Sequence, residues 1–137
     1  MTLNKKSFLV IAFILVGVTI LIFVFNIVNQ SPKKVVTNIM EDVQENKEVE
    51  EISNENQKKL QYFFEYSQER NLENPNLIVS DFPSRPNIVT VTIEIIQNDK
   101  KKGIEAIYEG RADFYLKKQG LKWEVEKIQV TPYKKER

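Results

Sequence analysis

An uncharged apolar run from Phe8 to Val28 limits what this chain can fold into more than any other feature of the sequence. Its only polar side chains are those of Thr19 and Asn26. As an α-helix rising about 1.5 Å per residue, the run would be roughly 31 Å long, which matches the hydrocarbon core of a bilayer. The sequence therefore predicts a transmembrane anchor at 8–28, preceded by a short cytoplasmic tail at 1–7.

A cleaved secretory signal peptide is the alternative interpretation of this segment. Lys5 and Lys6 would supply its positively charged N-terminal region. The apolar part of a signal peptide, however, is usually about 7–15 residues long and is followed by a cleavage site of small residues. This run is longer, and 26–30 contains no pair of small residues. An uncleaved anchor is therefore favoured, and the absence of cysteine excludes a lipoprotein anchor.

The charges that flank the run favour opposite orientations of the helix in the membrane. Lys5 and Lys6 favour a cytoplasmic N-terminus, whereas Lys33 and Lys34 on the other side oppose it. Single N-terminal anchors of this kind commonly leave the C-terminal domain outside the cytoplasm. We therefore expect a single-pass protein of the cell membrane with an extracytoplasmic domain.

The 108 residues after Asn29 are enough for one small domain with a single core. They carry eighteen basic and nineteen acidic residues, which gives a formal charge of −1. This balance argues against nucleic acid as a partner, because binding to phosphates requires a marked basic excess. The domain has no cysteine and no histidine. Disulfides, thiolate metal sites and histidine-based catalysis are thereby excluded, so we expect a non-enzymatic domain with no metal and no cofactor.

Two helices are expected next. Ser31-Pro32 is a typical helix start, and an apolar stripe follows it at helical spacing. The stripe consists of Val35, Val36, Ile39, Met40 and Val43. Within the polar segment 44–58, Val49 and Ile52 either continue this juxtamembrane helix, assigned to 29–52, or belong to a short second one. Ser53 could cap a further helix with Leu60, Phe63 and Phe64 on its buried face.

From Leu77 onward the apolar period changes from helical to alternating, which predicts strands. They are expected at 77–79, 88–96, 104–117 and from Leu121 onward. Gly110 predicts a bulge or sharp bend in the third strand, and a phase change near Glu126-Lys127 predicts a bulge in the fourth. Pro132 is expected to end that strand and leave a charged tail at 132–137. The predicted fold class is α+β, with the N-terminal helices packed on a curved antiparallel sheet of three to four strands, and the domain continuing over 53–131.

The order of these elements resembles that of the NTF2-like (cystatin-like α+β) superfamily, and the resemblance is best over Ile88–Val130. The segment YLKKQGLKWEVEKI at 115–128 is similar to the closing hairpin of that family, in which the last strand carries a tryptophan followed by apolar residues. The family includes enzymes, ligand binders and scaffolds. Its membrane-anchored members include the inner-membrane scaffold component of type IV secretion and similar conjugation proteins of Gram-positive bacteria, and the resemblance implies a bacterial protein of this kind.

The favoured function is a non-catalytic, membrane-tethered interaction or scaffold domain in an envelope or secretion/conjugation-type assembly. Its expected partners are the lipid bilayer through 8–28, other membrane or envelope proteins, and a second copy of the chain. The solvent-side face of the sheet, proposed as the interface, would include Thr90, Thr92, Ile107 and Tyr115, although a plain solvated face is equally compatible with these residues.

Two other functions use different residues. A small-ligand binder would use a cavity between helices and sheet lined by Tyr108, Phe114 and Trp123, although ordinary core packing is the simpler interpretation of these aromatic residues. An enzyme would need paired carboxylates. Glu105 and Glu109 are about 13 Å apart along one strand face, too far for a glycosidase pair, and Glu94 could approach one of them across the hairpin. A surface ladder of charges explains these three groups better.

Overall fold

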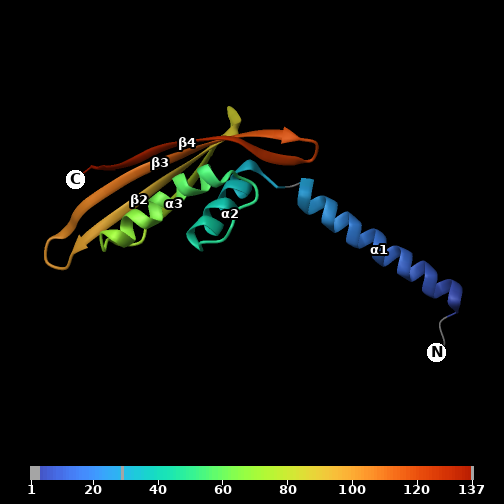
Figure 1. The fold of residues 1–137 in the computed structure, drawn as a ribbon. Helices are drawn as coiled ribbons and strands as arrows, with labels where there is room; N and C mark the ends of the chain where they lie inside the picture. Colours follow the sequence, from blue (N-terminus) through green and yellow to red (C-terminus); the bar gives the residue numbers. More distant parts are fainter. Residues whose placement is uncertain (1–3, 29, 137) are drawn as a thin grey trace.

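The first helix, α1 (Lys5–Val28), projects away from the remainder of the chain in the computed structural model, which describes residues 4–28 and 30–136 (Figure 1). A segment of 22 residues within it, Lys5–Asn26, has a mean hydropathy of 3.2 in its most apolar window, and none of that window is buried against the protein. α1 is therefore long and apolar enough to cross a bilayer, and it is not a core helix of the domain.

The rest of the chain is an α+β domain, as predicted. Two helices precede four antiparallel strands, and together these elements are α2 (Pro32–Gln44), α3 (Asn54–Glu69), β1 (Asn76–Phe82), β2 (Arg85–Asp99), β3 (Gly103–Gln119) and β4 (Lys122–Lys135). The strands form one sheet in the order β1-β2-β3-β4, so each strand pairs with its neighbours in the sequence. Both helices lie on the same side of this sheet (Figure 1).

Both helices begin where the sequence predicts. The Ser31 hydroxyl accepts a hydrogen bond of 3.2 Å from the Lys34 amide, and Pro32 occupies the first turn of α2. The Ser53 hydroxyl accepts an equivalent bond of 3.2 Å from the Asn56 amide at the start of α3. In each case the serine satisfies a backbone donor that the helix itself cannot pair.

The segment between α2 and α3 differs from both sequence-based alternatives, since it is neither a continuation of α2 nor a second short helix. Asn46 has a φ of 58°, a left-handed conformation that a continuing helix does not allow. Gln57 of α3 then holds the loop: its side-chain amide donates to the Lys47 carbonyl at 3.0 Å and its side-chain oxygen accepts from the Val49 amide at 3.2 Å. The bonds let Val49 reach the core, where it is 3% exposed, without a helix to carry it.

Two irregularities shape the edge strand β4. The register of β3 and β4 shifts between Tyr115 and Leu116, leaving Glu126 as an extra residue, which confirms the bulge predicted there. A second shift lies opposite Gly110, where β4 again contains one more residue than β3. The prediction that Pro132 ends the strand is wrong: β4 continues through it to Lys135, because an edge strand with a bulge tolerates a residue that cannot donate a ladder hydrogen bond.

The core lies between the helices and one face of the sheet. The predicted stripes of α2 and α3 are buried there, and β2 and β3 contribute alternate residues from the facing side. The residues in this cluster are Val35, Val36, Ile39, Met40, Val43, Val49, Leu60, Phe63, Phe64, Val89, Val91, Ile93, Ala112, Phe114, Leu116 and Ile128. Burial of this apolar area is the main force that stabilises the domain.

Candidate functional site

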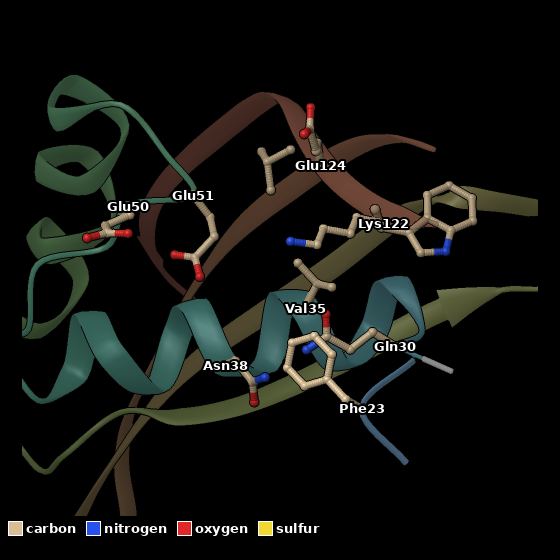
Figure 2. Close-up of a pocket in the computed structure, with 10 residues that line it drawn as sticks. Phe23, Gln30, Val35, Asn38, Glu50, Glu51, Lys122 and Glu124 are labelled. Carbon is tan, nitrogen blue, oxygen red and sulfur yellow. The ribbon is translucent and has the colours of Figure 1, made fainter. Parts of the chain in front are cut away.

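A pocket of about 620 Å³ lies at the end of the domain nearest α1 (Figure 2). Five parts of the chain line it: the last turns of α1, Gln30 just before α2, the first half of α2, the loop before α3 and the first residues of β4. The lining residues are Phe23, Gln30, Val35, Asn38, Glu50, Glu51, Lys122, Trp123, Glu124 and Val125. The two-residue link between the Ser31 cap and the end of α1 brings a residue of the apolar helix into the same site as the domain.

The charged groups of this pocket beside α1 do not converge on one point. Figure 2 shows the Lys122 side chain extending across the pocket above Val35, toward the side from which Glu51 enters, while the carboxylates of Glu50 and Glu124 point elsewhere. Within residues 4–28 and 30–136, no group of three or more acidic side chains is placed to hold a metal ion. The pocket thus combines an apolar wall with separate charged groups.

The structure does not bring the three predicted pocket residues together. Trp123 is half-buried and lines the pocket beside α1. Phe114 is fully buried in the core. Tyr108 lies opposite Lys135, whereas Trp123 lies opposite Lys118 ten positions further along β3, a separation of about 33 Å. Only Trp123 of the three therefore lines this pocket, and its neighbours there come from α1, α2 and a loop that the sequence pattern did not connect with it.

The predicted interface residues share the face of the sheet that carries no helix. The cross-strand register places Thr90 opposite Asp113, Thr92 opposite Arg111, Ile107 opposite Ile96 and Tyr115 opposite Ile88. This outer face is polar at its centre and apolar toward both ends. A shallower depression of about 470 Å³ on the same face is lined by Phe82, Ser84, Arg85, Ile88, Thr90, Arg111, Asp113 and Tyr115.

A hydrogen-bonded group orders the centre of the outer face. The Thr90 hydroxyl donates to the Asp113 carboxylate at 2.7 Å, and the Arg111 guanidinium lies 3.2 Å from the same carboxylate. The Asp113 side chain is only 13% exposed, so these two partners satisfy a largely buried carboxylate. The cross-strand register places these side chains on one face, and the hydrogen bond and ion pair bring them into contact.

The carboxylates considered for catalysis lie on the same outer face. Glu94 and Glu109 are directly opposite each other on β2 and β3, so Glu94 does approach one of the two β3 carboxylates, as predicted. Lys134 lies opposite Glu109 on its other side, in β4. The result is a ladder of acidic and basic side chains across three strands.

A group of tyrosines lies between α3 and the end of β4. It includes Tyr133, which the sequence analysis assigned to a charged tail at 132–137. Tyr133 lies 4.7 Å from Tyr66, 5.2 Å from Phe63 and 6.0 Å from Tyr62 between ring centres, and its hydroxyl donates to the Phe63 carbonyl at 3.0 Å. Burial raises the pKa of Tyr133 well above its ordinary value, and the neighbouring Tyr62 and Tyr66 add to this rise. The group anchors the end of β4 to α3.

Comparison with protein-family models, with curated proteins and with solved structures gives no match for this chain.

Proposed function

We propose that this chain is a non-catalytic, membrane-anchored interaction protein whose domain associates with other envelope proteins and with a second copy of itself. The supporting observation is α1, in which none of the most apolar window within Lys5–Asn26 is buried against the domain, although the helix is long enough to span a bilayer. Bilayer insertion gives those side chains an apolar environment, and the domain is then held within a few residues of the membrane surface.

The outer face of the sheet is the surface proposed for association. It has no helix over it, and it combines apolar ends with a polar centre, as an interface core and rim often do. Ile107 faces Ile96 at one end, and Tyr115 faces Ile88 at the other. Packing two such faces around a twofold axis would bury these pairs and bring the Thr90 and Thr92 positions of the two copies together.

The proposed setting is the extracytoplasmic side of a bacterial membrane, in an assembly of the secretion or conjugation type. Two helices followed by a bulged antiparallel meander are what the NTF2-like resemblance implies, and in that fold the open sheet face is commonly used for pairing. The resemblance is carried by the segment 115–128, which in this chain forms the hairpin of β3 and β4. Residues of the outer face, rather than a catalytic centre, would then carry the function.

Single-cysteine cross-linking tests the proposal, because the natural chain contains no cysteine that could interfere. Thr92→Cys on the outer face is expected to form disulfide-linked dimers in membranes under mild oxidation. Lys58→Cys, on the exposed side of α3, is the matched control on the opposite layer and is expected to stay monomeric. Equal cross-linking at both positions, or none at Thr92, would show that the outer face is not the self-association surface.

A small-ligand binder is the second candidate, and the observation that favours it is the pocket beside α1. Its volume of about 620 Å³ lies within the range of small-molecule sites, about 300–1,000 Å³. Trp123 is the only tryptophan of the chain, so its fluorescence reports on this pocket alone. A ligand bound there should change the emission, and Asn38→Trp in a Trp123→Phe background should respond to the same ligand, because Asn38 is an exposed residue of the same lining. An emission change at Trp123 without a response at position 38 would place the ligand outside the pocket.

A further inference from the structure

The turn between β3 and β4 lies at the membrane end of the domain. Gln119 pairs with Lys122, so Gly120 and Leu121 form a two-residue turn, and the φ of +61° at Gly120 is the one that such turns require at their first position. The first residues of β4 line the same pocket as Phe23 of α1 and Gln30. Figure 1 shows this hairpin, in orange and red, beside the end of α1 that joins the domain.

The exposed surface of this end is rich in lysine. Five lysines are exposed around it, and among the residues that the structure describes none of them forms an ion pair. They are Lys33 and Lys34 at the start of α2, and Lys117, Lys118 and Lys122 on the hairpin. Three carboxylates near them, Glu50, Glu51 and Glu124, leave an excess of positive charge.

The tip of the hairpin adds an apolar group to this charge. Leu121 is 55% exposed, although a turn between two strands usually carries a polar residue in that position. Trp123 follows two residues later and is half-buried. Tryptophan is enriched at the level of lipid headgroups, where its ring is partly in an apolar environment and its N–H can still meet water.

We propose that the β3–β4 hairpin is a second membrane contact, which binds a lipid surface carrying anionic headgroups next to the α1 anchor. The inference rests on the proposed function, since α1 must be inserted for the hairpin to be held at the surface. The lysines match the negative charge of the headgroups, and Leu121 enters the boundary with the acyl chains. Because the link to α1 makes this contact intramolecular, a weak interaction is enough to hold the domain in one orientation.

The hairpin between β2 and β3 provides a matched control within the same chain. It also has a lysine cluster, Lys100 to Lys102, and an apolar residue near its tip, Ile104, which is 44% exposed. However, it lies at the opposite end of β3, about 50 Å away along a strand of 17 residues. Composition alone would predict the same behaviour for both hairpins, whereas the proposal predicts contact only for the hairpin next to α1.

The test uses the full chain reconstituted into vesicles, with an environment-sensitive fluorophore attached to Leu121→Cys or, as the control, to Ile104→Cys. The vesicles contain either phosphatidylcholine alone or phosphatidylcholine with phosphatidylglycerol. The Leu121 label is expected to shift to the blue and to be quenched by brominated lipids only when phosphatidylglycerol is present, and the Ile104 label is expected to remain in water. A Leu121 label that stays aqueous in the anionic vesicles overturns the proposal, as does an equal response at both tips.

Charge removal gives a second measurement. Lys118→Gln with Lys122→Gln should lower the ratio of bound to free hairpin about 25-fold, or roughly fivefold for each lysine, whereas Lys100→Gln with Lys101→Gln should leave it unchanged.

Flotation of the vesicles after an alkaline wash distinguishes a failure of the hairpin contact from a failure of the α1 anchor. If the chain floats while the Leu121 label stays aqueous, only the hairpin contact is wrong; if the chain does not float, the anchor and the proposed function fail with it.

Discussion

Gly110→Ala tests whether the sheet and α3 approach each other as closely as the structure shows. A Cβ at this position would lie 2.6 Å from Cε1 of the Phe63 ring and 3.3 Å from the ring of Tyr133. Carbon atoms in favourable contact are about 3.5–4.0 Å apart, so the Phe63 ring would have to move by about 1 Å. The ring is fully buried and packed edge-on against Tyr62 and Tyr133, which leaves it little room.

The expected magnitude follows from two opposing effects. Overpacking a well-filled core costs about 1–3 kcal/mol, whereas replacing glycine by alanine restricts the unfolded chain and stabilises by about 0.4–1 kcal/mol. We therefore expect Gly110→Ala to lower the free energy of unfolding by about 1–2 kcal/mol. Urea unfolding of the full chain in detergent micelles, followed by Trp123 fluorescence, measures this loss.

A second substitution identifies the cause of the loss. Phe63→Leu removes Cε1, so in that background Gly110→Ala should cost at least about 1 kcal/mol less than in the natural chain. Gly103→Ala is the control: it should also destabilise, because Gly103 has a φ of +79°, but its Cβ would meet nothing within 4 Å and Phe63→Leu should not rescue it. A Gly110→Ala variant as stable as the natural chain, or one that Phe63→Leu does not rescue, would refute the close packing of Phe63 on Gly110.

Three further predictions concern other contacts of the domain. The pKa of Tyr133 is higher in the folded than in the unfolded chain, so its contribution to stability should be complete below about pH 10 and decrease as the pH rises further. Alkaline titration followed by ultraviolet difference spectroscopy should show a late ionisation step, and Tyr133→Phe should abolish that step. Ser53→Ala should destabilise by about 1 kcal/mol in thermal unfolding, and Ser53→Asp should not, because aspartate also caps helices. Gln57→Ala should speed amide hydrogen exchange at Val49 while leaving exchange in β2 unchanged, because both loop hydrogen bonds come from this one side chain.

The parts of the fold that the sequence predicts well are those decided by neighbours in the chain. The serine caps and the alternation of Val89 to Ile95 follow from local hydrogen bonding and from the two-residue period of a strand. The bulge at Glu126 was visible as a change of phase in the same pattern. These features need no knowledge of distant residues.

The features that were missed depend on contacts between distant residues. The loop before α3 is held by a hydrogen bond from the Val49 amide to the side chain of Gln57, eight residues further along the chain. The periodicity of 44–58 does not predict this hydrogen bond. Tyr133 joins the rings on α3 from 70 residues away, so Pro132 was interpreted as the end of the strand. The pocket beside α1 likewise requires the relative positions of α1, α2 and β4, and of its lining residues the sequence analysis singled out only Trp123 as a pocket residue.

β3 runs the whole length of the domain, and this has a consequence for how the protein meets other molecules. One end of the strand lies beside α1, and the other lies about 50 Å away, farther than a bilayer is thick. In the membrane-anchored arrangement that we propose, proteins embedded in the same membrane would reach the first end, while large soluble molecules that cannot approach the lipid would reach the second. The strand would then separate two groups of neighbours, and substitutions at its two ends should impair different associations.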